Sequence, residues 1–114
     1  MTADPKLYLT HISESINWIE GYLKDVSEKD FYASKQVQDA VVRQLEIIGE
    51  ATKNISEDFK KLHPGIPWKQ MAGMRDVLIH GYFDVDIDLV YDTAHDQIPA
   101  LKKQISELLN TTTV

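Results

Sequence analysis

Three side chains within eight residues of the sequence could together act on a phosphate group. Arg75 is followed by His80 and Tyr82 in the segment RDVLIHGY at 75–82. A histidine titrates near neutrality and can move a proton to or from a ribose 2′-hydroxyl or a leaving 5′-oxygen. An arginine can stabilise the negative charge that builds on a phosphorane-like transition state. Since neither step requires a divalent metal, the segment predicts metal-independent chemistry on a phosphodiester.

A purely structural interpretation of the same residues is also open. His80 could interact with the dipole at the C-terminal end of a helix, and Arg75 could be solvated or paired. Tyr82 could be half-buried, with its hydroxyl reaching solvent.

The spacing of the cation and the imidazole limits how they can meet. On an ideal helix Arg75 and His80 lie about 140° apart, so one straight helix does not bring them together. Either the helix unwinds at Gly81, or two chains related by a two-fold axis each contribute an arginine and a histidine to one cleft.

The composition restricts the contacts that this chain can make. Its 114 residues suffice for one domain, 1–114, with one core. The net charge is −6, and only Arg43 and Arg75 are arginines, so any contact with nucleic acid has to be local. We expect Lys69 to extend the positive field around Arg75. The absence of cysteine excludes disulfides and thiolate metal sites.

Two long helices are predicted in the first half of the chain. Asp4 before Pro5 reads as an N-cap, and apolar residues then recur three or four apart until Val26. SEKD at 27–30 breaks the pattern, and a second stripe begins near Ser34 and runs to Ile55. We expect a neighbouring backbone to approach the second helix closely at Gly49.

Two further helices are predicted in the second half. Ser56 caps a short turn that HPGIP at 63–67 ends, and Pro67 opens a third helix that Gly81 terminates. A fourth helix, with a kink at Pro99, carries an apolar repeat. Its members are Ile87, Val90, Ala94, Ile98, Leu101, Ile105 and Leu108. The pattern predicts an all-α, up-and-down bundle of four to five helices.

The remaining polar clusters have simpler explanations. The alternating Asp84, Asp86 and Asp88 lack the glycine and the final acidic ligand of a calcium loop, so we expect them to cap the fourth helix rather than bind metal. His63 is expected in an exposed loop, and Arg43 is expected to pair with Asp39 or Glu46. His11 and His95 have no ligand-like partners nearby in the sequence. No metal and no other cofactor is expected.

Nearly the whole chain resembles the HepT-like ribonuclease toxins of the HEPN superfamily. The resemblance lies in QDAVVRQLEIIGEATKNIS at 38–56 and in the stretch from WKQMAGMRDVLIHGYFDV onward. It is specific at IGEA, at the IPW start of the third helix and at the arginine to tyrosine motif. Arg75, His80 and Tyr82 match that motif position by position, and Asp76 stands where the superfamily usually carries a polar residue.

The resemblance implies a function, a partner and a form of control. It implies a metal-independent endoribonuclease with catalytic Arg75 and His80 at the cleft of a two-fold HEPN dimer. It further implies the toxin of a type VII toxin–antitoxin pair. The antitoxin would be an MntA-type minimal nucleotidyltransferase, which would silence the toxin by AMPylation of Tyr82.

Two other functions are possible for this chain. It could be a non-catalytic helical module that binds and regulates a nucleotidyltransferase, or a plain structural dimer.

No stretch approaches the roughly 20 apolar residues that span a bilayer, so we expect no membrane partner and a cytoplasmic location.

Overall fold

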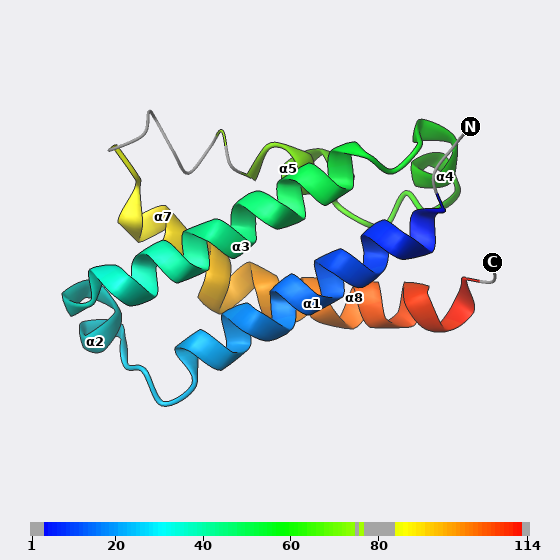
Figure 1. The fold of residues 1–114 in the computed structure, drawn as a ribbon. Coiled ribbons are helices and arrows are strands. Elements are labelled where there is room, and N and C mark those ends of the chain that lie inside the picture. The colour runs from blue at the N-terminus through cyan, green and yellow to red at the C-terminus, as the bar shows by residue number, and fades with distance from the viewer. Residues whose placement is uncertain (1–3, 75, 77–83, 113–114) are drawn as a thin grey trace.

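A computed structural model of the chain describes residues 4–74, 76 and 84–112, and these form helices and no strand (Figure 1). The predicted all-α class is therefore confirmed. The elements are α1 (Pro5–Leu23), α2 (Glu28–Ala33), α3 (Lys35–Lys53), α4 (Glu57–Leu62), α5 (Trp68–Ala72), α7 (Ile87–Asp92), the π-helical turn η1 (Thr93–Gln97) and α8 (Ile98–Thr111).

The long helices α1 and α3 each begin directly after a residue whose side chain caps the helix. The carboxylate of Asp4 accepts a hydrogen bond from the backbone N–H of Lys6 at 2.9 Å, and the hydroxyl of Ser34 accepts one from that of Val37 at 3.1 Å. Helix α1 ends at Leu23, earlier than predicted, because the backbone of its C-cap Lys24 is extended, with ψ of 127°. Asp25 then takes a left-handed conformation with φ of 59°.

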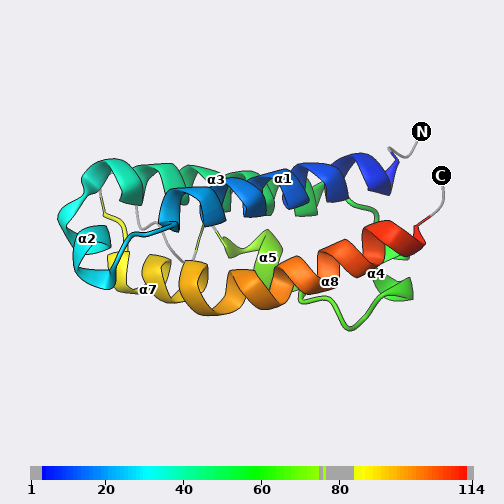
Figure 2. The ribbon, with the colours of Figure 1, turned by 90° about the horizontal axis from the view of Figure 1, so that it is seen from below.

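The helices form two layers around one apolar core. Helices α1 and α3 lie side by side in one layer, and α7, η1 and α8 form the rod of the other (Figure 2). The predicted apolar stripes face each other across this interface, and their central residues are buried. These include Ile12, Ile16, Ile19, Val41, Leu45, Ile48, Val90, Ile98, Leu101 and Ile105. Gly49 is buried within α3, and the close approach predicted there stays a prediction.

The break expected at 27–30 is in fact the start of a short helix, α2. The hydroxyl of Ser27 accepts from the backbone N–H of Asp30, and the carboxylate of Asp30 accepts from that of Ser27, which makes a capping box. Phe31 follows and is fully buried. The turn of helix therefore adds a large apolar side chain to the core.

The third helix differs from its predicted extent. Ser56 caps α4 as predicted, and its hydroxyl accepts from the backbone N–H of Phe59. Helix α5 then ends at Ala72 with Gly73 as its C-cap, a break that the sequence pattern did not predict. Met74 is helical again, whereas the predicted end of this helix at Gly81 lies outside the described residues.

The interruption predicted at Pro99 takes the form of a π-helical turn. Since Pro99 has no N–H, it cannot donate to the carbonyl of residue 95. The preceding segment η1 widens instead, and the N–H of Ile98 donates to the carbonyl of Thr93, five residues back. Helices α7 and α8 are thus one rod with a bulge.

No helix in the described part of the chain is both long and apolar enough to cross a membrane.

Candidate functional site

The predicted motif is flanked on both sides by well-packed elements. Arg75, His80 and Tyr82 themselves lie outside the described residues, so their geometry is not described. Asp76 is described and is exposed. The site is therefore defined by the helix that precedes it and the helix that follows it, both of which pack on α3.

The preceding flank is fixed by apolar contacts. Met71 is 1% exposed and Met74 is 7% exposed, and both belong to the core. Helix α5 packs against α3 (Figure 1), so the chain enters the motif from a fixed position. Burying a methionine side chain contributes roughly 1.5–3 kcal/mol.

The following flank is fixed by a helix cap. The carboxylate of Asp86 accepts a hydrogen bond from the backbone N–H of Leu89 at 3.1 Å, as the capping interpretation predicted. Val85 packs against the core, and Val90 in the first turns of α7 is fully buried. The cap and these apolar contacts thereby fix the start of α7, which follows shortly after the motif in the sequence.

We expect removal of this cap to destabilise the protein. Asp86→Ala should lower the free energy of unfolding by about 0.5–2 kcal/mol, because an orphan N–H of α7 loses its acceptor. The measurement is urea denaturation followed by circular dichroism. Asp84→Ala is the matched control, since Asp84 is exposed and outside the helix. Equal stability of the two variants would contradict the capping role.

A second carboxylate, that of Asp88 in the first turn of α7, ties α7 to α2. The hydroxyl of Tyr32 donates a hydrogen bond to Asp88 at 2.5 Å. This bond, helped by partial burial and by the negative charges of Asp88, Glu28 and Asp92, raises the pKa of Tyr32 to about 12. The phenol therefore stays protonated, and keeps donating, to a higher pH than an ordinary tyrosine.

Aromatic rings extend this connection. The ring of Tyr91 lies 5.1 Å from that of Phe31, between centroids, and stacks on the ring of His95 at 5.3 Å. Helix α2, which the sequence interpretation missed, thus supports the flank that follows the motif. The signal that could have revealed it is the capping-box pattern of Ser27 and Asp30 ahead of an aromatic residue.

Cavities lie beside each flank of the motif. One of about 610 Å³ lies between α4 and α5, ahead of the motif in the chain. Another of about 540 Å³ is lined by α2, the start of α3, Val85 and Ile87, where the chain leaves the motif. Helix α3 runs behind both flanks, so they belong to one side of the bundle.

One of the minor sequence predictions needs correction. His63 is not an exposed loop residue but the half-buried C-cap of α4, and its ring packs 4.7 Å from that of Phe59. Asp39 forms an ion pair with Lys35 at 3.0 Å, and the pairing of Arg43 with Asp39 or Glu46 stays a prediction. His95 bonds Asp96 through Nδ1 at 2.9 Å, a pair at the surface.

Comparison with known proteins identifies one family. The model of the family described as "Ribonuclease HepT-like" matches residues 12–108, a range that contains the whole motif. No solved structure matches the chain.

Two relatives can be aligned with this chain over most of its length. It is 49% identical to "Probable ribonuclease HepT" of Thermococcus cleftensis over 95% of this chain and 98% of that protein. It is 43% identical to a "Putative RNase" of Caldanaerobacter subterraneus over 92% of this chain and 94% of that protein.

A third relative is longer. The chain is 50% identical to the "Gamma-glutamylcyclotransferase and putative RNase" of Methanocaldococcus jannaschii over 96% of this chain. It spans only 49% of that protein's length.

Proposed function

Because this chain belongs to the ribonuclease HepT-like family, we propose that it is an endoribonuclease whose catalytic residues are Arg75 and His80. The observation that carries the proposal is the family match over residues 12–108, which includes the intact motif at 75–82. The names of the relatives from Thermococcus and Caldanaerobacter support the same activity.

The proposed reaction needs only groups that the motif supplies. The 2′-oxygen of a ribose attacks the adjacent phosphorus and loses its proton to a base, while the bond from phosphorus to the 5′-oxygen breaks. The leaving 5′-oxygen takes a proton from an acid. His80 serves as base or acid, and Arg75 stabilises the charge on the phosphorane. The products are a 2′,3′-cyclic phosphate and a 5′-hydroxyl.

A two-fold dimer would complete this site. One straight helix separates Arg75 from His80 by about 140°, whereas a two-fold cleft supplies two of each. One histidine can then act as the base while the other acts as the acid. Two arginines at such a cleft also create a local positive field on a chain whose net charge is −6.

The biological role that fits this activity is that of a toxin. An endoribonuclease that cleaves RNA essential to its own cell arrests growth unless a partner silences it. The proposed partner is an MntA-type nucleotidyltransferase antitoxin of a type VII system, and the proposed target of AMPylation is the hydroxyl of Tyr82. Asp76 would support the motif beside Arg75.

The experiment that tests the proposed activity is RNA cleavage by the purified chain in excess EDTA. We expect the cleavage rate to be the same in EDTA and in magnesium, because no step of the proposed reaction uses a metal. The rate is measured on a fluorescently labelled RNA by denaturing gel electrophoresis. Activity that is abolished by EDTA and restored by magnesium would overturn the mechanism.

A further inference from the structure

The charge of the chain changes sign at the motif. Between residues 59 and 75 every charged side chain is basic, and between 76 and 96 every charged side chain is acidic. The basic residues are Lys60, Lys61, Lys69 and Arg75, and the acidic ones are Asp76, Asp84, Asp86, Asp88, Asp92 and Asp96. A polyanion at the motif would therefore be attracted toward the preceding flank and repelled by the following one.

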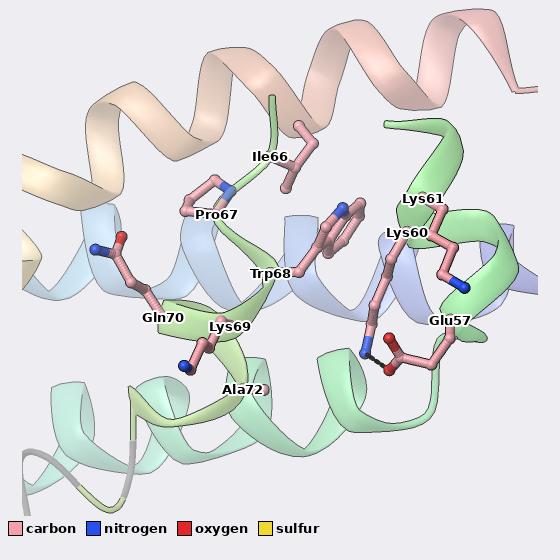
Figure 3. A pocket seen from close by; sticks show the side chains of 9 residues that line it. All are labelled: Glu57, Lys60, Lys61, Ile66, Pro67, Trp68, Lys69, Gln70 and Ala72. Carbon is pink, nitrogen blue, oxygen red and sulfur yellow. Dashed lines mark hydrogen bonds and ion pairs between the residues drawn. The ribbon is translucent and has the colours of Figure 1, made fainter. Parts of the chain in front are cut away.

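The three lysines of the basic segment line one cavity, Lys60 and Lys61 on the side of Glu57 and Lys69 on the side of Gln70 (Figure 3). Lys60 and Lys61 come from α4 and Lys69 from α5, and all three line the cavity of about 610 Å³ between these helices (Figure 3). We call this cavity the lysine pocket. The same cavity is lined by Glu57, its one acidic side chain.

Two of the three lysines are available to a ligand. Nζ of Lys60 lies 3.3 Å from the carboxylate of Glu57, and the side chain of Lys60 is only 12% exposed. Lys61 and Lys69 are exposed and form no ion pair within the described part of the chain. The lysine pocket thus carries two uncompensated positive charges on a protein with a net charge of −6.

The aromatic residue in the wall of the lysine pocket is not exposed enough for a nucleic-acid base to stack on it. Trp68 is 8% exposed, and its Nε1 already donates to the carbonyl of His63 at 2.9 Å. The ring of Phe59 packs edge-on against that of Trp68 at 6.3 Å between centroids. Since the indole is committed to the fold, the lysines and Gln70 are the groups left to bind a ligand, and the lysines suit phosphate oxygens.

The lysine pocket is also close to the motif along the chain. Ala72 lines the pocket and stands three positions before Arg75. Three residues of chain span at most roughly 11 Å. A phosphate held in the pocket and a phosphate at the motif can therefore belong to one strand.

We propose that the lysine pocket binds the RNA backbone on one side of the scissile phosphate through Lys61 and Lys69. The inference rests on the proposed ribonuclease function and adds the direction in which the RNA strand runs across the protein. The strand leaves the motif over α4 and α5 and avoids the acidic start of α7. The pocket acts in binding, while cleavage stays with the motif.

The test measures binding separately from cleavage. The probe is a fluorescein-labelled 2′-O-methyl RNA oligonucleotide, which has no free 2′-hydroxyl and stays intact. Its affinity is measured by fluorescence anisotropy over a series of salt concentrations. The test variant is Lys61→Gln/Lys69→Gln, and Lys61→Arg/Lys69→Arg keeps the charge. The matched control is Lys24→Gln/Lys29→Gln, which removes two exposed lysines near α2, at the far end of the molecule from α4 (Figure 1).

We expect the Lys61→Gln/Lys69→Gln variant to bind on the order of tenfold more weakly, which corresponds to about 1.4 kcal/mol. The slope of log affinity against log salt should fall by about 1.4, since two phosphate contacts are lost. The arginine variant and the Lys24→Gln/Lys29→Gln control should bind like the wild type. Circular dichroism confirms that each variant is folded.

Two outcomes would overturn the inference, and they are distinguishable. If the wild type cleaves RNA and the two glutamine variants bind equally well, the lysine pocket is not the backbone site, while the proposed function stands. If the wild type neither binds the probe nor cleaves RNA, the proposed function and this inference fail together.

Discussion

Arg75→Ala and His80→Ala should each abolish most RNA cleavage. Loss of a general acid or base typically costs about 10²–10⁴-fold in rate, and loss of a group that stabilises transition-state charge costs about 10²–10³-fold. Initial rates on a labelled RNA measure the loss. Thermal melting should change little, because the sequence predicts neither residue in the core.

The chain offers matched controls for both substitutions. Arg43 is the one other arginine, and His95 is an exposed histidine whose Nδ1 bonds Asp96. Arg43→Ala and His95→Ala should keep wild-type rates. Full activity in both motif variants would reject the proposed site.

Mixing the two inactive variants tests whether the site is shared. If each working site takes its arginine and its histidine from different chains of a dimer, a mixed dimer of Arg75→Ala and His80→Ala regains one intact pair. Part of the activity should then return. No recovery, with exchange of subunits demonstrated, would indicate either that both residues come from one chain or that the reaction needs both histidines of the dimer.

Adenylylation of Tyr82 should remove cleavage as completely as loss of His80. In the proposed site, an attached adenylate would bring a phosphodiester anion within the same eight-residue motif as Arg75, where it would compete for the cation that receives the RNA phosphate. Its base and sugar would also occupy space at the proposed dimer cleft. Growth of cells that express the chain, with and without the nucleotidyltransferase, reports the effect.

Mass spectrometry of the co-expressed chain decides whether modification is the means of control. We expect adenylate on the peptide that contains Tyr82 and none on the peptides that contain Tyr32 or Tyr91. Tyr82→Phe should stay toxic in the presence of the partner. If the partner protects equally well against Tyr82→Phe and the wild type carries no adenylate, the partner acts by binding alone.

The apolar periodicity predicted the long helices well because their burial follows directly from it. The repeat from Ile87 to Leu108 predicted one rod, and each residue from Val90 onward in that repeat is buried. The caps at Asp4 and Ser56 were also predicted from the sequence, since a cap acts within a few residues of itself.

Short elements were harder to predict because they depend on contacts with distant residues. Helix α2 has only six residues, too few to show a periodicity, and it is held by Phe31 and by the bond from Tyr32 to Asp88, 56 positions away. The end of α5 at Gly73 was missed for a similar reason, because the apolar spacing of Met71 and Met74 continues through the break.

The site was predicted from residue types and their order, and part of its support was predicted as well. Histidine, arginine and tyrosine at that spacing indicate phosphate chemistry, and the alternating aspartates predicted the cap that Asp86 supplies to α7. No sequence pattern indicated the bond from Tyr32 to Asp88. The lysine pocket likewise depends on α4 and α5 folding toward each other across the HPGIP turn.

The most direct measurement of the central claim is the chemical identity of the cleaved ends. A defined RNA is incubated with the wild-type chain in excess EDTA, and the fragments are analysed by mass spectrometry, with His80→Ala as the blank. We predict that one fragment ends in a 2′,3′-cyclic phosphate and the other begins with a 5′-hydroxyl, and that neither appears with His80→Ala. Fragments with 3′-hydroxyl and 5′-phosphate ends, or identical fragments from His80→Ala, would contradict cleavage by the 2′-hydroxyl at this motif.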